Sequence, residues 1–422
     1  MTDDRTVGIE AINFYGGIAK LDVFKLAEYR NLDMKRFENL LMKERTVPMP
    51  YEDPVSLGIN AAKPIIDSLS EEDKNKIEMV VTCSESGIDF GKSMSTYIHD
   101  YLGLKKNCRL FELKNACYSG TAGFQTAVNF ILSKTSPGAK ALVVATDLAK
   151  FMATDAGEAL MADWSFAEPS GGAGAIAMLV SDKPYIFKVD VGANGYYGYE
   201  VMDTCRPVPD SESGSSDLSL MSYLDCCDAA FNEYRQRVAD VDYATSFQYL
   251  VFHTPFGGMI KGAHRNRMRK DYHMKPDMVE ADFEKRVMPG LKYCQRVGNI
   301  MGATVFLSLV STICNGDFES PKRIGMYSYG SGCCSEFYSG VVNEKGQQLL
   351  RSMNIEKYLD ERYEISIEQY EKLLRLNCDV PFGTRNLELD KECIPEILNA
   401  ERTRKVLVLD KIKEYHREYV WI

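Results

Sequence analysis

Runs of apolar residues recur along the chain, and several are apolar at successive positions rather than at every second one. Met79-Val80-Val81 and Leu142-Val143-Val144 are examples. Continuous apolar strands are typical of a sheet with helices packed on both faces. The segments predicted to be strands are 77–83, 109–113, 141–147, 173–181, 247–253 and 323–329. Helical spacing separates them, which predicts a layered α/β fold, and the charged stretch 343–375 predicts peripheral helices.

Length and composition narrow the class of protein. A chain of 422 residues exceeds the usual single core, so we expect about two to three domains or one duplicated architecture. The 50 Lys and Arg against 60 Asp and Glu give a net charge of −10, which argues against a nucleic-acid binder. No apolar run approaches the roughly 20 residues that cross a bilayer, and the acidic first residues lack an apolar signal segment. We therefore expect a cytoplasmic protein without membrane contact.

The twelve cysteines do not indicate a disulfide framework, because such frameworks belong to short secreted domains. No Cys-x-x-Cys pair occurs and the five histidines are scattered, so we expect no metal site. Most of the thiols are expected to pack as small hydrophobic side chains.

The densest chemical signal is Asn-Ala-Cys-Tyr-Ser-Gly at residues 115–120, between a predicted strand and a segment of helical spacing. Cys117 is thus expected at a helix start, where the backbone amides and the helix dipole favour its thiolate. Such a nucleophile suits thioester exchange. The alternative is a small buried cysteine without chemistry.

Two further polar side chains follow predicted strands, where α/β proteins gather functional groups. Glu85 comes just after the strand 77–83 and is a candidate general acid or base. His253 closes the strand 247–253 and could donate a proton or stabilise an oxyanion. A solvated loop glutamate and a hydrogen-bonded structural histidine are the alternatives.

Two segments in the C-terminal part could orient a substrate oxygen. Asn299 precedes an apolar helix and could hold a carbonyl through its amide, although Asn is also a common helix N-cap. The turn 329–332, with Ser331, could supply backbone amides to an oxyanion, or be only a tight turn. No glycine cluster forms a nucleotide-binding motif.

A basic run follows His253. Lys261, Arg265 and Arg269 share one face if the segment is helical, and this face could dock an acidic partner. A merely solvated face is the alternative.

Taken together, these segments resemble the 3-hydroxy-3-methylglutaryl (HMG) synthases of the thiolase superfamily over essentially the whole chain. The matching segments are the family's Asn-Ala-Cys-Tyr at 115–118, Glu-x-Gly at 85–87, Phe-His-x-Pro at 252–255, Ser-Tyr-Gly-Ser-Gly at 328–332 and Gly-Gly-Ala-Gly-Ala at 171–175. Asp147 and Asp203 fall where the family carries supporting acidic residues.

The resemblance implies a thiolase-like, five-layered αβαβα fold with two similar halves, residues 1–170 and 171–422. It implies catalytic roles for Cys117, Glu85 and His253. It also implies substrate-binding or oxyanion roles for Asn299, Ser331, Asp147, Asp203 and Tyr118. Family members are usually homodimers, which leads us to expect the same here.

Two departures from the family pattern bear on the substrate. The family's Gly-Asn-x-Tyr-Thr is Gly-Asn-Ile-Met-Gly at 298–302, and the positions of the lysines that hold coenzyme A are Gly258 and Gly262. A weakened grip on coenzyme A indicates another carrier. The sequence is most similar to the HMG synthases of polyketide β-branching, which act on acyl carrier proteins, so Lys261, Arg265 and Arg269 are the predicted docking residues.

The implied reaction joins a Cys117-bound acetyl group to the β-ketone of a β-ketoacyl chain on a carrier protein. Phosphopantetheine arrives on that partner, and no cofactor bound to the enzyme is expected. The alternatives are a coenzyme A-dependent HMG-CoA synthase of isoprenoid metabolism, a β-ketoacyl synthase and a non-catalytic scaffold that binds carrier proteins.

Overall fold

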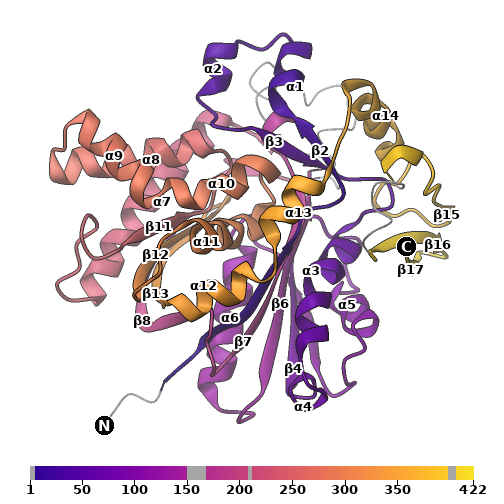
Figure 1. Ribbon diagram of the computed structural model, residues 1–422, viewed down its shortest axis with the longest axis horizontal. Coiled ribbons are helices and arrows are strands. Elements are labelled where there is room, and N and C mark those ends of the chain that lie inside the picture. Colours follow the sequence, from indigo (N-terminus) through magenta and orange to yellow (C-terminus); the bar gives the residue numbers. More distant parts are fainter. Residues whose placement is uncertain (1–4, 150–167, 208–211, 398–404) are drawn as a thin grey trace.

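The computed structural model describes residues 5–149, 168–207, 212–397 and 405–422. Nine of the described strands form one mixed sheet in the order β11-β12-β13-β8-β1-β7-β6-β4-β5 (Figure 1). Their bounds are β1 Gly8–Tyr15, β4 Ile77–Cys83, β5 Arg109–Leu113, β6 Lys140–Leu148, β7 Ala173–Ser181, β8 Phe187–Gly198, β11 Tyr249–Phe252, β12 Lys322–Gly330 and β13 Cys334–Val342. All six predicted strands are present, most with bounds within one residue of the prediction.

The sheet contains the same pairing pattern twice. In the first half β4 runs parallel to β6, and β6, β7 and β1 follow with antiparallel pairing. In the second half β11 runs parallel to β12, and β12, β13 and β8 follow in the same way. The halves join where Gly8 and Ile9 of β1 pair with Lys188 and Phe187 of β8. The expected two similar halves are therefore confirmed, with β5 as an additional strand at the edge of the first.

Helices complete five layers around these strands. The layer-forming helices are α3 Pro54–Ser68, α6 Ser119–Ser133, α7 Ser216–Arg237 and α11 Thr304–Asn315. Helix α3 packs outside β1, β6 and β7, and α7 packs outside β8 and β13. Helices α6 and α11 lie between the two parts of the sheet (Figure 1), where the rings of Phe124 and Phe306 contact each other with centroids 5.6 Å apart. This αβαβα order confirms the predicted fold class.

Local sequence explains these elements. Strands β6 and β7 are buried at every position because helices cover both of their faces. Helix α3 begins with a capping box between Asp53 and Ser56, with Pro54 at its first position. The starts of α6 and α11 touch so closely that a Cβ on Gly120 would lie 2.1 Å from the backbone oxygen of Gly302. Only glycine allows this approach at the centre of the molecule.

Strand pairing bears on where the halves divide. The predicted division at 170/171 precedes β7, but β7 pairs with β1 and β6 of the first half. We propose a division between β7 and β8 instead.

The remaining elements lie at the periphery. The charged stretch 343–375 forms the helices α12 Glu344–Arg351, α13 Ile355–Glu361 and α14 Ile367–Cys378, as predicted. The other helices of the described residues are α1 Val23–Tyr29, α2 Met34–Glu38, α4 Glu71–Lys74, α5 Ser95–Tyr101, α8 Gly257–Tyr272, α9 Pro276–Arg286 and α10 Met288–Val297. Short strands are β2 Ala19–Asp22, β3 Glu44–Val47, β9 Thr204–Cys205, β10 Ser213–Gly214, β14 Tyr363–Glu364, β15 Leu387–Glu388, β16 Leu407–Lys413 and β17 His416–Trp421. None of the helices within the described ranges has the length and apolar character needed to cross a membrane.

Candidate active site

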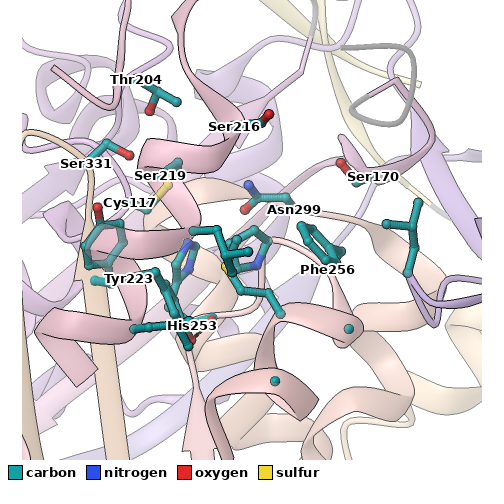
Figure 2. A pocket seen from close by; sticks show the side chains of 18 of the residues that line it. Cys117, Ser170, Thr204, Ser216, Ser219, Tyr223, His253, Phe256, Asn299 and Ser331 are labelled. Atoms are coloured by element: carbon teal, nitrogen blue, oxygen red, sulfur yellow. Dashed lines mark hydrogen bonds between the residues drawn. The ribbon is translucent and has the colours of Figure 1, made fainter. Parts of the chain in front are cut away.

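A cavity of about 1010 Å³ lies where the two halves meet. Its wall includes Glu85 and Cys117 from the first half and His253, Asn299 and Ser331 from the second. Figure 2 shows Cys117, His253 and Asn299 around the same space, with Ser331 close to Cys117. The structure therefore brings together five predicted site residues that are far apart in the sequence.

Cys117 lies in the connection between β5 and α6. The preceding residue, Ala116, has φ 43°, a left-handed conformation that costs an L-residue roughly 1–2 kcal/mol. The turn from the other half packs directly on this connection, since a Cβ on Gly330 would lie 2.6 Å from the backbone nitrogen of Tyr118. The position of the thiol is thus set by contacts from both halves.

The prediction that Cys117 forms its thiolate easily is wrong for the resting site. Removal from water raises the pKa of the Cys117 thiol well above its usual value, and the nearby carboxylates of Glu85, Asp147 and Glu212 raise it further. The thiol therefore keeps its proton at neutral pH.

The loop that carries Glu85 is held in place by the carboxylate of Asp147. The Asp147 carboxylate accepts hydrogen bonds from the Ser84 hydroxyl (2.9 Å) and from the backbone amides of Glu85 (2.9 Å) and Ser86 (3.0 Å). Burial and the charge of Glu85 raise the pKa of Asp147 to about 7. Asp147 does not line the cavity, so it fixes the loop that carries Glu85 rather than contacting substrate.

Glu85 also has a cationic partner from the second half. A guanidinium nitrogen of Arg206 lies 2.9 Å from the Glu85 side-chain oxygen, and Arg206 also donates to the Glu85 backbone oxygen at 3.2 Å. Glu212 lines the cavity near this pair, and burial raises the pKa of Glu212 to about 7. The base is thus part of a charged cluster that contains residues of both halves.

His253 is buried and neutral. Burial lowers its pKa to about 3, so the imidazole carries no positive charge at physiological pH. The Tyr223 hydroxyl donates to the His253 backbone oxygen at 2.7 Å, and the His253 amide donates to the Tyr327 carbonyl at 2.8 Å. The backbone of His253 is therefore held firmly while its ring faces the cavity. A neutral ring can donate a hydrogen bond to substrate but cannot supply a proton as imidazolium.

Asn299 is not the helix N-cap that the sequence allowed, since Ile300 holds that position before the 3₁₀ turn Met301–Ala303. Its side-chain oxygen accepts hydrogen bonds from the Met301 amide and the Thr304 hydroxyl, each at 3.0 Å. Its backbone pairs with Ser170 and Gly172 of the first half. Because the oxygen is engaged, the amide NH₂ is the part of this side chain that a substrate oxygen could use.

The turn that carries Ser331 is held by Asp203. One carboxylate oxygen of Asp203 accepts from the Tyr329 hydroxyl at 2.6 Å, and the other accepts from the Gly332 amide at 2.8 Å. Asp203 is fully buried and does not line the cavity. Asp203 therefore fixes the conformation of the turn that carries Ser331, as Asp147 fixes the loop that carries Glu85.

Tyr118 does not line the cavity. Its hydroxyl donates to the buried Glu336 on β13 at 2.7 Å, and Gln125 donates to the same carboxylate at 2.8 Å. Burial raises the pKa of Glu336 to about 7. Tyr118 thus ties α6 to the second half, and this geometry does not favour the predicted substrate-binding or oxyanion role.

The predicted docking residues lie on α8, and two of them belong to the cavity wall. Arg265 and Arg269 are exposed and line the cavity, so they mark its mouth. Lys261 lies outside the wall and forms an ion pair with Glu280 of α9. The structure therefore separates Lys261 from the other two members of the predicted stripe.

Comparisons with known proteins agree with this geometry. The model named hydroxymethylglutaryl-coenzyme A synthase N terminal matches residues 3–184, and its C-terminal counterpart matches residues 274–419. The chain is 64% identical to the polyketide biosynthesis 3-hydroxy-3-methylglutaryl-ACP synthase PksG of Bacillus subtilis (strain 168), over 99% of each chain. The chain belongs to the hydroxymethylglutaryl-coenzyme A synthase family.

Two further members of the family are informative. The crystal structure of the curacin biosynthetic pathway HMG synthase in complex with acetyl donor-ACP superposes with a TM-score of 0.95, at 63% identity over 99% of this chain and 100% of that one. The hydroxymethylglutaryl-CoA synthase of Enterococcus faecalis is 32% identical over 94% of this chain and 99% of its own length. The family resemblance inferred from the motifs is confirmed, and the chain is an enzyme of this synthase family.

Sequence reasoning on this synthase missed four residues in or beside the site. Arg206, which pairs with Glu85, and Glu212, which lines the cavity, lie in a segment from which only Asp203 was selected. Ser216 and Ser219 on α7 also line the wall. Arg206 could have been suspected, since it shares the Met-Asp-Thr-Cys-Arg-Pro segment with Asp203. No sequence motif indicated that one face of α7 lines the cavity.

Within the ranges that the structure describes, no group of three or more His, Cys, Asp or Glu side chains is arranged to hold an ion.

Proposed function

We propose that this synthase installs β-branches on polyketide intermediates held by acyl carrier proteins. It would condense a Cys117-bound acetyl group with the ketone of a β-ketoacyl chain and leave a 3-hydroxy-3-methylglutaryl-type branch on the acceptor. The observation that carries this proposal is one cavity lined by Cys117, Glu85, His253 and Asn299 in a chain 64% identical to a polyketide HMG-ACP synthase.

The first step loads the acetyl group. The Cys117 sulfur attacks the carbonyl of an acetyl thioester on the carrier's phosphopantetheine, and the carrier's thiol leaves. The proton of Cys117 ends on the departing thiol, so the exchange converts one thioester and one thiol into another such pair. Because its raised pKa keeps Cys117 protonated at rest, the cysteine itself provides the proton that the departing thiol takes up.

The second step forms the carbon nucleophile. Glu85, held by Asp147 and paired with Arg206, removes a proton from the acetyl methyl group. Backbone amides near Cys117 and Ser331 would stabilise the enolate oxygen, where the loss of one donor typically costs about 10² to 10³ in rate.

The third step forms the branch. The enolate attacks the acceptor's ketone, and Glu85 returns its proton to the new alkoxide. The neutral His253 ring and the Asn299 amide would orient the ketone oxygen by donating hydrogen bonds. Water then cleaves the acyl-Cys117 thioester and releases the new carboxylate.

Features of the cavity mouth support a carrier protein as donor. Acyl carrier proteins are acidic, and Arg265 and Arg269 lie exposed at the mouth. Family members that use coenzyme A place lysines where this chain has Gly258 and Gly262, both in the cavity wall. A Cβ atom at position 258 would lie 2.0 Å from the backbone oxygen of Asn39. A Cβ atom at position 262 would have no atom within 4 Å.

The choice of donor provides the central test. Acetyl transfer to Cys117 is measured by intact mass with acetyl-carrier protein and with acetyl-CoA at equal concentration. Faster loading from the carrier supports the proposal. Faster loading from coenzyme A favours the coenzyme A-dependent synthase, for which the 32% identity to the Enterococcus enzyme is the supporting observation. No adduct from either donor favours a non-catalytic scaffold.

Charge reversal tests the docking surface separately. R265E and R269E should each slow loading from the carrier about 5- to 50-fold and leave loading from a small acetyl thioester unchanged. R235E on the exposed part of α7 is the matched control. The predicted contribution of Lys261 is smaller, because Glu280 already pairs with it.

Two parts of the proposal concern assembly. We propose that phosphopantetheine reaches the site only on partner proteins, with donor and acceptor carriers using the same mouth in turn. We also propose a homodimer, as is usual in the family, and light scattering of the purified protein measures its mass directly.

A further inference from the structure

A second cavity of about 910 Å³ meets the first at the reacting groups. Both cavities are lined by Glu85, Thr204, Glu212 and Ser331. Beyond these shared residues they diverge. The first leads to Arg265 and Arg269, whereas the second passes the far side of the Cys117 segment. A substrate bound at the junction could therefore extend in two directions.

The chemistry of the acceptor calls for two directions. The ketone carbon that receives the branch carries one arm that leads to the thioester and a second arm, the rest of the acyl chain. If the thioester arm enters from the arginine-lined mouth, the second arm must leave on the opposite side of the reacting centre. We propose that the second cavity holds this distal acyl chain and so determines which acceptors the enzyme accepts.

The lining suits an acyl chain. Apolar side chains contribute from four separate segments, namely Ile88, Leu110, Phe111, Val201, Met202 and Phe382. Phe90 marks the solvent end, since it is 89% exposed and its ring lies 4.7 Å from that of Phe382. A cavity of this size falls in the range of small-molecule sites, roughly 300–1,000 Å³.

Three charged side chains in the same wall, those of Asp53, Arg417 and Glu112, are engaged with protein partners. Asp53 and Arg417 form a buried ion pair of 3.0 Å, and the Tyr419 hydroxyl donates to the same carboxylate at 2.8 Å. Glu112 accepts hydrogen bonds from the Met94 amide at 2.8 Å and from Thr82 at 3.2 Å. An apolar chain could therefore enter without stripping these groups of their partners.

This inference rests on the proposed function and makes it more specific. An acetoacetyl acceptor ends in a methyl group beyond its ketone and needs only the junction. A longer β-ketoacyl chain needs the second cavity. Chain length therefore separates the two parts of the argument.

The first experiment narrows the cavity away from the reacting groups. I88W and V201W are compared with the wild type on acetoacetyl- and 3-oxododecanoyl-carrier protein, with M221W on the exposed face of α7 as control. We expect kcat/KM for the long acceptor to fall at least about tenfold and that for acetoacetyl to change less than about twofold. Equal effects on both acceptors, or none, would overturn the proposal. If the wild type converts neither acceptor, the proposed function itself fails.

A second experiment locates the chain without depending on turnover. A 3-oxoacyl-carrier protein with a diazirine at the chain terminus is irradiated with the enzyme, and cross-linked peptides are sequenced. Cross-links to residues 86–93, 110–111 or 200–202 support the proposal. Cross-links confined to α2 or α8, beside the first cavity, contradict it.

Discussion

The two halves share one backbone plan but contribute different chemistry. Glu85 follows β4 and His253 follows the corresponding strand β11. Ala116 (φ 43°) and Met301 (φ 48°) are each left-handed, three residues before α6 and α11 begin at Ser119 and Thr304. At the next position the first half has Cys117 and the second has glycine.

Each half also supports the helix start of the other. The end of β12 packs Gly330 against the 115–118 connection of the first half. The segment before β7 pairs Ser170 and Gly172 with Asn299 of the second half. The repeated backbone thus places side chains at equivalent positions in both halves. The first half provides the reacting groups, Cys117 and Glu85, and the second half provides neutral groups that orient the substrate, His253 and Asn299.

The largest expected effect is in the first half. C117A removes the nucleophile, so acetyl loading should disappear and turnover should fall by about 10⁴-fold or more. Intact mass after incubation with the acetyl donor measures loading. C378A, at an exposed cysteine outside the cavity, is the matched control and should load normally. An acetyl adduct that persists on C117A would place the nucleophile elsewhere.

E85Q separates the two chemical steps of the first half. We expect acetyl loading to survive, while condensation falls about 10²- to 10⁴-fold because the methyl proton has no acceptor. E78Q, on the preceding strand β4, is the matched control and should behave as the wild type. Condensation that survives E85Q would indicate the His-based chemistry of a β-ketoacyl synthase.

H253A tests the second half at the corresponding position. Since burial lowers the pKa of His253 to about 3, the ring is already neutral above about pH 5, and its hydrogen bonding does not change between pH 5 and 8. Condensation should therefore fall by the same factor, about 10²-fold, at every pH in that range. A pH–rate profile that loses an inflection near pH 6.5 in H253A would contradict a neutral role.

The smallest effect concerns the contact between the halves. Y118F removes the hydroxyl that donates to the buried Glu336, so the free energy of unfolding should fall by about 1–3 kcal/mol. Turnover should change less than about threefold if Tyr118 only joins the halves. Denaturant unfolding and steady-state kinetics measure the two quantities. A large loss of turnover without loss of stability would restore the oxyanion role.

Much of the fold could be predicted because it depends on local pattern. Strands β4, β6 and β7 were identified from their continuous apolar runs. Strands β1, β8 and β13 were not proposed, although they complete the pairing of both halves. The amphipathic signal of β8 is weak because it alternates between buried and exposed positions only along part of its length.

The sequence predicted which residues line the candidate site better than it predicted their ionisation states. The motifs selected Cys117, Glu85, His253, Asn299 and Ser331, and all five line one cavity. The ionisation of Cys117 was mispredicted, because its helix start is a local feature whereas Glu85, Asp147 and Glu212 approach it only in three dimensions. Arg206 and the second cavity were missed for the same reason.

By itself, the sequence determined the layered class, the chemical types at the strand ends and helix starts, and the family. These properties follow from the spacing of side chains along the backbone, which is local. Only the tertiary structure decided which groups face one another, which charges share a low-dielectric site and where space remains. Coulomb interactions and cavities depend on distance in space, and this chain brings residues of both halves, far apart in sequence, to a single point.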